Sequence, residues 1–128
     1  MTAMGQRLQA GETLYSAWFP RGGDYAVFRA QLIDKAGSGS PEIVTTVYHK
    51  NKEDAGDGSI LQVGGGSTDV EIVLTDGMGN GQIVSADTGN YSSEEAPLKE
   101  LVRLKFACTG NWMRFQMLQP AWYNKARV

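Results

Sequence analysis

Apolar and polar residues alternate with a period of two along much of this chain, most clearly between residues 100 and 119. A tight turn at residues 109–111 separates two alternating stretches. The apolar face is made by Val102, Leu104, Phe106 and Cys108 before the turn and by Met113, Phe115 and Met117 after it. An antiparallel sheet with one wetted face requires this alternation. The two stretches therefore predict paired strands whose apolar faces lie in a core.

Strand signals recur along the whole chain, separated by clusters of turn-forming residues. The predicted strands are Thr13–Phe19, Tyr25–Asp34, Glu42–Lys50, Ser59–Val63, Val70–Thr75, Gln82–Ala86, Glu100–Thr109 and Trp112–Gln119. Helical periodicity is nearly absent. The best helical candidate, Ser93–Leu101, is short and contains Pro97. About seven or eight short strands predict an all-β fold, an antiparallel β-sandwich or jelly roll.

Length and charge narrow the classes of protein and partner. The 128 residues predict a single β-sandwich domain over 1–128, with the segments 1–12 and 119–128 as candidate interface arms. The net charge of −2 provides no basic field, so we expect no nucleic-acid partner. No stretch approaches the roughly 20 apolar residues that span a bilayer, so we expect no membrane partner. The polar start lacks a signal peptide, which predicts cytoplasmic synthesis and leaves later incorporation into a particle open.

Catalytic and metal-binding chemistry has few candidate residues. His49 is the only histidine and Cys108 the only cysteine, and the alternation places Cys108 on the apolar face. One histidine and one cysteine do not assemble a structural zinc site within one chain. The acidic loop 51–58 lacks the EF-hand pattern, although calcium binding there is left open. We therefore expect no enzyme, with no catalytic residue, no metal and no cofactor.

Two aromatic segments near the chain ends are the strongest candidates for an interface. Each joins a tryptophan to an adjacent aromatic residue, a proline and a following cation. The predicted interface residues are Trp18, Phe19, Arg21, Trp122 and Tyr123. Trp, Tyr and Arg dominate the hot spots of protein interfaces. In the alternative interpretation, Trp18 and Trp122 lie in the core or pack against each other on paired terminal strands.

Three segments carry a resemblance to known proteins: residues 16–24 (SAWFPRGGD), 99–103 (KELVR) and 112–120 (WMRFQMLQP). Together they resemble a set of small bacterial all-β proteins to which no activity is attached. The size and strand style also resemble the small β-sandwich proteins of tailed-phage-like particles, such as head decoration and connector proteins. This second likeness is one of fold type and implies a place in a shell only by analogy.

Two functional hypotheses follow. The leading one is a non-enzymatic structural or assembly protein, a subunit of a homo-oligomer or of a phage-like shell or particle. Its partners would be copies of itself, a larger shell protein, or both. The alternative is a β-sandwich that binds carbohydrate or another ligand, because exposed aromatic rings stack on the apolar faces of sugars. Tyr25, Tyr48, Tyr91 and Trp112 could contribute to such stacking.

Overall fold

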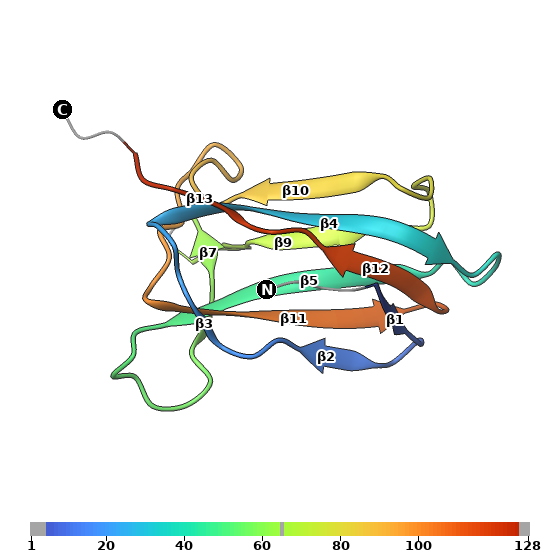
Figure 1. The fold of residues 1–128 in the computed structure, drawn as a ribbon, viewed down its shortest axis with the longest axis horizontal. Coiled ribbons are helices and arrows are strands. Elements are labelled where there is room, and N and C mark those ends of the chain that lie inside the picture. Colours follow the sequence, from blue (N-terminus) through green and yellow to red (C-terminus); the bar gives the residue numbers. More distant parts are fainter. Residues whose placement is uncertain (1–4, 65, 126–128) are drawn as a thin grey trace.

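The computed structural model describes residues 5–64 and 66–125, and in these residues the protein is all-β (Figure 1). The strands are β1 (Gln6–Leu8), β2 (Thr13–Tyr15), β3 (Phe19–Pro20), β4 (Tyr25–Lys35), β5 (Glu42–Lys50), β6 (Ser59–Ile60), β7 (Gln62–Val63), β8 (Thr68–Asp69), β9 (Glu71–Leu74), β10 (Ile83–Asp87), β11 (Leu101–Thr109), β12 (Met113–Met117) and β13 (Ala121–Tyr123). Within the described ranges, no helix is long and apolar enough to cross a membrane.

Two antiparallel sheets pack face to face, which confirms the predicted β-sandwich. Sheet A has the order β1-β12-β4-β10, and β13 continues β12 along the same side of β4. In sheet B, β2 and β3 follow one another along one side of β11, and β5 lies on the other side. Strands β6 and β9 then share the far side of β5.

The pairing of early with late strands identifies the topology. Strand β1 pairs with β12, β2 with β11, β4 with β10, and β5 with β9. The chain is thus one long antiparallel hairpin whose successive pairs alternate between the two sheets. This arrangement is a jelly roll, which covers both inner faces with one core.

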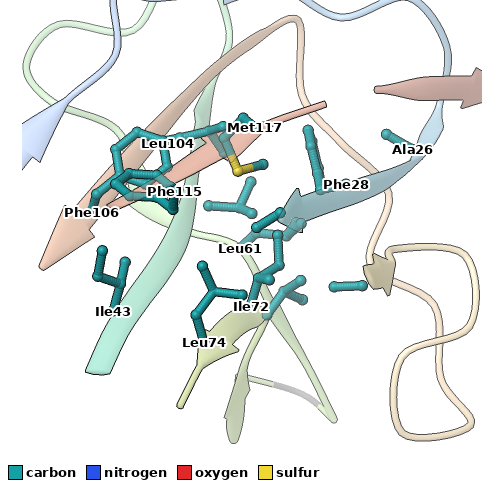
Figure 2. Close-up of a cluster of buried hydrophobic side chains, with 14 of the residues drawn as sticks. Ala26, Phe28, Ile43, Leu61, Ile72, Leu74, Leu104, Phe106, Phe115 and Met117 are labelled. Carbon is teal, nitrogen blue, oxygen red and sulfur yellow. The ribbon is translucent and has the colours of Figure 1, made fainter. Parts of the chain in front are cut away.

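The core lies between the sheets and follows the predicted alternation. Every residue of the apolar faces predicted on either side of the 109–111 turn is at most 4% exposed. Phe106 of sheet B and Phe115 of sheet A meet across the core with ring centroids 5.0 Å apart. Figure 2 shows these two rings side by side, close to Leu104. Phe28 of β4, which belongs to sheet A like Phe115, points into the same core.

One predicted strand, Thr13–Phe19, is interrupted at Ser16. The Ser16 amide donates to the Leu104 carbonyl at 2.9 Å, as a ladder residue would. The return bond is different, because the Leu104 amide donates to the Ser16 hydroxyl at 2.9 Å instead of to a carbonyl. This change of acceptor from a carbonyl to a hydroxyl ends β2, and pairing with β11 resumes only at β3. A predicted strand over Ser59–Val63 is likewise divided, into β6 of sheet B and β7 of a separate two-stranded sheet.

The helical candidate at Ser93–Leu101 is wrong. Ser92 and Ser93 have φ angles of 51° and 64°, which an α-helix does not admit. Two backbone donors that a helix would use are bound instead by residues that flank strands β10 and β4. The Ala96 amide donates to Thr88 at 2.7 Å and the Leu98 amide to Asp24 at 2.8 Å. These long-range bonds hold the segment open.

Parts of the two predicted interface arms belong to sheet A. Strand β1, from the arm 1–12, pairs with β12, and β13, from the arm 119–128, pairs with β4. Residues 1–4 and 126–128 of these arms lie outside the described residues. Neither β1 nor β13 was predicted from the sequence, because each is three residues long and too short for a clear alternation.

Candidate functional site

The aromatic residues of the two chain ends separate into two environments. Trp122 is half-buried and lies edge-on to Phe19 and Phe28, with centroid distances of 6.2 Å and 6.0 Å. Both Trp122 and Phe19 pack against the hydrophobic core. Trp18 lies elsewhere, over the outer face of sheet B. The structure therefore does not unite the five predicted interface residues in one patch.

Tyr123 and Arg21 tie the chain ends to the body of the protein. The Tyr123 ring stacks on Tyr25 with centroids 5.6 Å apart, and its hydroxyl donates to the Asp87 carboxylate. Burial, together with Asp87, raises the pKa of Tyr123 to about 12. The Arg21 guanidinium donates to the Leu98 carbonyl and forms an ion pair with Asp24 at 3.3 Å. These contacts account for the two residues as structural supports.

Trp18 instead adjoins a cavity on the outer face of sheet B. This cavity has a volume of about 350 Å³ and is lined by Tyr15, Tyr48, Asp57 and Arg103. The Arg103 guanidinium carbon lies 5.7 Å from the centre of the Trp18 ring. We call this cavity, with Trp18 at its rim, the Arg103 pocket. Among its residues, only Trp18 and Tyr48 were singled out from the sequence.

Strand register brings the pocket residues together. Arg103 of β11 pairs with Tyr48 of β5 on one side. Its outward neighbour Lys105 pairs with Tyr15 of β2 on the other side. Because side chains alternate along a strand, the burial of Val102 and Leu104 directs Arg103 outward. The pocket floor is therefore built on three adjacent strands, which hold it more rigidly than loops would.

The Arg103 side chain is fixed at one end and open at the other. Its Nε donates to the Ser16 carbonyl at 3.0 Å, and its guanidinium carbon lies 4.6 Å from the centre of the Tyr15 ring. In the described part of the chain, this is the only hydrogen bond that the Arg103 side chain donates. The guanidinium also lies near the Trp18 ring and forms an ion pair with Asp57 at 4.0 Å, and the Asp57 side chain is 94% exposed. The terminal N–H groups of Arg103 are thus available to a ligand.

The loop 51–58 carries Asp57 to the rim of the pocket. Gly58 has a φ of +71°, and a side chain there would come within 2.6 Å of the His49 carbonyl and 3.0 Å of the Trp18 ring. Lys50 donates to the Gly56 carbonyl at 2.8 Å and lies 4.6 Å from the centre of the Trp18 ring. These contacts seat the loop against Trp18. Among the described residues, no three His, Cys, Asp or Glu side chains gather to hold a metal ion.

The two residues considered for nucleophilic catalysis have structural surroundings. His49 Nδ1 accepts a hydrogen bond from the Lys99 amide at 3.1 Å, and burial, aided by Lys99, lowers its pKa to about 4. Cys108 is buried, as predicted, and burial raises its thiol pKa. Its Sγ donates to the Asn111 carbonyl at 3.1 Å. Neither residue lines the Arg103 pocket.

Of the four aromatic residues proposed for sugar stacking, only Tyr48 lines the Arg103 pocket, and the other three lie at separate places. Trp112 lies under the Arg7 guanidinium at 4.4 Å, near the β1 edge of sheet A. Tyr91 accepts a hydrogen bond from the Glu71 amide at 3.2 Å, and Tyr25 stacks on Tyr123. These four rings therefore do not form one stacking surface.

Comparison with known proteins finds no significant match to this chain. No family model matches the chain, and no curated protein and no solved structure matches it significantly. The geometry of the Arg103 pocket is therefore the feature that points to a function.

Proposed function

We propose that this protein is a non-enzymatic jelly-roll module that binds a carbohydrate in the Arg103 pocket. The observation that carries the proposal is the convergence of two tyrosine rings, a carboxylate and a guanidinium on one cavity of about 350 Å³, with the Trp18 ring next to the same guanidinium. Ligand pockets of proteins have volumes of roughly 300–1,000 Å³. Aromatic rings stack on the C–H faces of a sugar, while charged groups form hydrogen bonds with its hydroxyl groups. The pocket offers both kinds of contact.

The pocket is also exposed and preorganised. Tyr15 is 47% exposed, and it is one of two large apolar side chains, with Ile83, exposed to this degree among the described residues. Its neighbours Tyr48 and Arg103 are on long paired strands, so a ligand does not need to order them. Binding to fixed groups loses little conformational entropy. An exposed ring held in this way is well suited to stacking.

Titration of a glycan panel tests the proposal, with intrinsic tryptophan fluorescence and calorimetry as readouts. We expect saturable binding of at least one glycan, and Tyr15→Ala should weaken it about three- to tenfold by removing one stacking surface. Ile83→Ala is the matched control, because Ile83 is equally exposed, at 48%, but lies on β10 of the other sheet. Silence of both readouts across the panel at millimolar sugar would contradict the proposal.

A second candidate function, assembly with copies of this chain, is favoured by the edge of sheet A. Strand β10 ends that sheet, so one side of its backbone faces no strand of sheet A. The exposed Ile83 lies at its start. An open edge with an exposed apolar side chain is a template for pairing with another chain. In this proposal the protein is a structural subunit of a homo-oligomer or of a phage-like particle, with β10 edges joined between copies.

Light scattering of the protein over a range of concentrations tests the assembly. We expect a discrete oligomer that Ser85→Pro disrupts, because the Ser85 amide points away from β4 and proline removes this backbone donor from the open edge. Tyr15→Ala, which alters the other sheet, should leave the oligomer unchanged. A monomer of 13.9 kDa at every concentration would refute assembly through this edge.

A further inference from the structure

The Arg103 guanidinium offers a specific arrangement of donors to a ligand. Its Nε is held by the Ser16 carbonyl, and one of its faces lies over the Tyr15 ring. The edge that carries the two terminal nitrogens is the part left for a ligand. A carboxylate fits this edge with two parallel N–H···O bonds, a geometry that a neutral hydroxyl does not reproduce.

The charges around the pocket favour an anion of low charge. Lys50 lies over the Trp18 ring, and Lys105 lies 6.0 Å from the centre of the Tyr15 ring. Besides Arg103 in the lining, two further cations therefore lie next to aromatic rings at the Arg103 pocket. Asp57 is the one acidic side chain in its lining, and a phosphate dianion would meet repulsion from this carboxylate. A single carboxylate can take the place of Asp57 beside Arg103 without that excess of charge.

Asp57 is a weak partner for Arg103, and its position makes it replaceable. The closest approach between the two groups is 4.0 Å, longer than a hydrogen bond, and Asp57 is almost fully exposed. Exposed ion pairs contribute only about 0–1 kcal/mol to stability. A ligand carboxylate that bonds directly to the guanidinium would therefore displace Asp57 at little cost.

We infer that the Arg103 pocket selects a sugar that carries a carboxylate, a uronic or sialic acid, over its neutral counterpart. This inference rests on the proposed carbohydrate-binding function. The sugar ring stacks on the exposed surfaces of Tyr15 and Tyr48, and its carboxylate pairs with the terminal nitrogens of Arg103. Asp57 occupies the position of that carboxylate when no ligand is bound, so the negative charge of the sugar is the feature that the pocket recognises.

Matched pairs of acid and methyl ester test the inference, because esterification removes the charge and keeps the ring. The probes are trigalacturonate, a glucuronic acid disaccharide and sialyllactose, each with its methyl ester, titrated by calorimetry. Hydrogen bonds to charged groups contribute roughly 1.5–3 kcal/mol, so we expect at least one acid to bind about tenfold or more tightly than its ester. This preference should decrease at high salt.

Three variants separate the contributions of the pocket charges. Arg103→Gln should remove the preference for the acid, with ester affinity changed less than about threefold. Arg103→Lys, which keeps the charge but not the paired donors, should retain only part of it. Asp57→Asn removes the competing carboxylate and should strengthen binding of the acid about threefold or more. Arg114→Gln is the control, because Arg114 is exposed on β12 of the other sheet.

The outcomes distinguish this inference from the function on which it rests. Equal binding of acid and ester, with no loss of selectivity in Arg103→Gln, would overturn the inference and leave carbohydrate binding intact. Absence of binding by every acid and ester, with the wild-type protein folded by circular dichroism, would overturn both. Weaker binding of acids by Asp57→Asn would also contradict the inference, because Asp57 would then be a ligand contact and not a competitor.

Discussion

Replacement of Trp122 with alanine distinguishes a structural role for the C-terminal aromatic segment from a role in an interface. Trp122 is half-buried between Phe19 and Phe28, both of which meet its ring edge-on. The backbone of Gly22 also packs against it, since a Cβ added at Gly22 would lie 2.5 Å from Trp122 Cγ. The side chain therefore holds β13 and the β3–β4 connection onto the core.

The cost of the substitution follows from these contacts. Each edge-to-face pair is worth about 0.5–1.5 kcal/mol beyond the area it buries, which gives about 1–3 kcal/mol for two pairs. Half of the burial of a large apolar side chain adds about 1 kcal/mol. We therefore expect Trp122→Ala to lower the free energy of unfolding by about 2–4 kcal/mol, a large part of the roughly 5–15 kcal/mol of a typical domain.

Urea denaturation, followed by circular dichroism, measures this loss. With an m-value of about 1–3 kcal/mol/M, the midpoint should fall by about 1 M or more. Trp112→Ala is a matched control, because Trp112 is also half-buried but is covered by one cation, Arg7. Its loss should cost about 0.5–1 kcal/mol for the cation–π contact and about 1 kcal/mol for burial, which is about 1.5–2 kcal/mol in total. Unchanged stability in Trp122→Ala, together with a changed solution mass, would refute the structural role and support the interface predicted from the sequence.

Three further predictions concern single positions. The pKa of His49 is lower in the folded protein, at about 4, than its ordinary value of 6.5. The stability that neutral His49 contributes is therefore fully present above pH 6.5 and is lost as the pH falls toward 4. The shift corresponds to at most about 3 kcal/mol, and screening at this half-buried site leaves about 1–2; urea titrations at pH 7 and 4.5 should show this loss, and His49→Asn should abolish it. Gly58→Ala should destabilise the protein by about 1 kcal/mol or more and shift its tryptophan fluorescence, because the φ of +71° disfavours a side chain and the added Cβ meets Trp18; an unchanged spectrum would contradict the packing of the loop 51–58. Within residues 5–64 and 66–125 the buried Thr45 hydroxyl has no hydrogen-bond partner, so Thr45→Val should be neutral or stabilising by about 1 kcal/mol, and a thermal scan that shows clear destabilisation would reveal a partner for it.

The faces of the long strands could be predicted from local sequence, but the neighbours of each strand could not. Alternation shows that Phe106 and Phe115 point into a core, because the pattern depends only on residues two apart. It does not show that Gln6 pairs with Phe115, or Tyr15 with Lys105. These pairings join segments about a hundred residues apart, and many partners would satisfy the same alternation. The jelly-roll order therefore follows from the packing of the whole chain.

The same limit explains why most of the Arg103 pocket was missed. Arg103 and Tyr48 each occupy a polar position on an alternating strand, where a solvated side chain is the usual result. What makes them a site is the register that sets them side by side and the loop that brings Asp57 above them. Trp18 was grouped with Phe19 because the two residues are adjacent in sequence, but Phe19 packs on Trp122 and Trp18 lies near Arg103. The strand break at Ser16 separates the two side chains instead.

Ser16 both interrupts the strand predicted over Thr13–Phe19 and helps to build the Arg103 pocket. The Ser16 hydroxyl takes the amide of Leu104 and so stops the ladder between β2 and β11. The carbonyl of the same residue accepts the Nε of Arg103 and orients its guanidinium. The break also releases the chain to place Trp18 beside the cavity before β3 resumes pairing. Departures from locally consistent patterns tend to occur at functional or strained positions. One serine that is inconsistent with a continuous strand therefore anchors the charged group on which ligand selection depends.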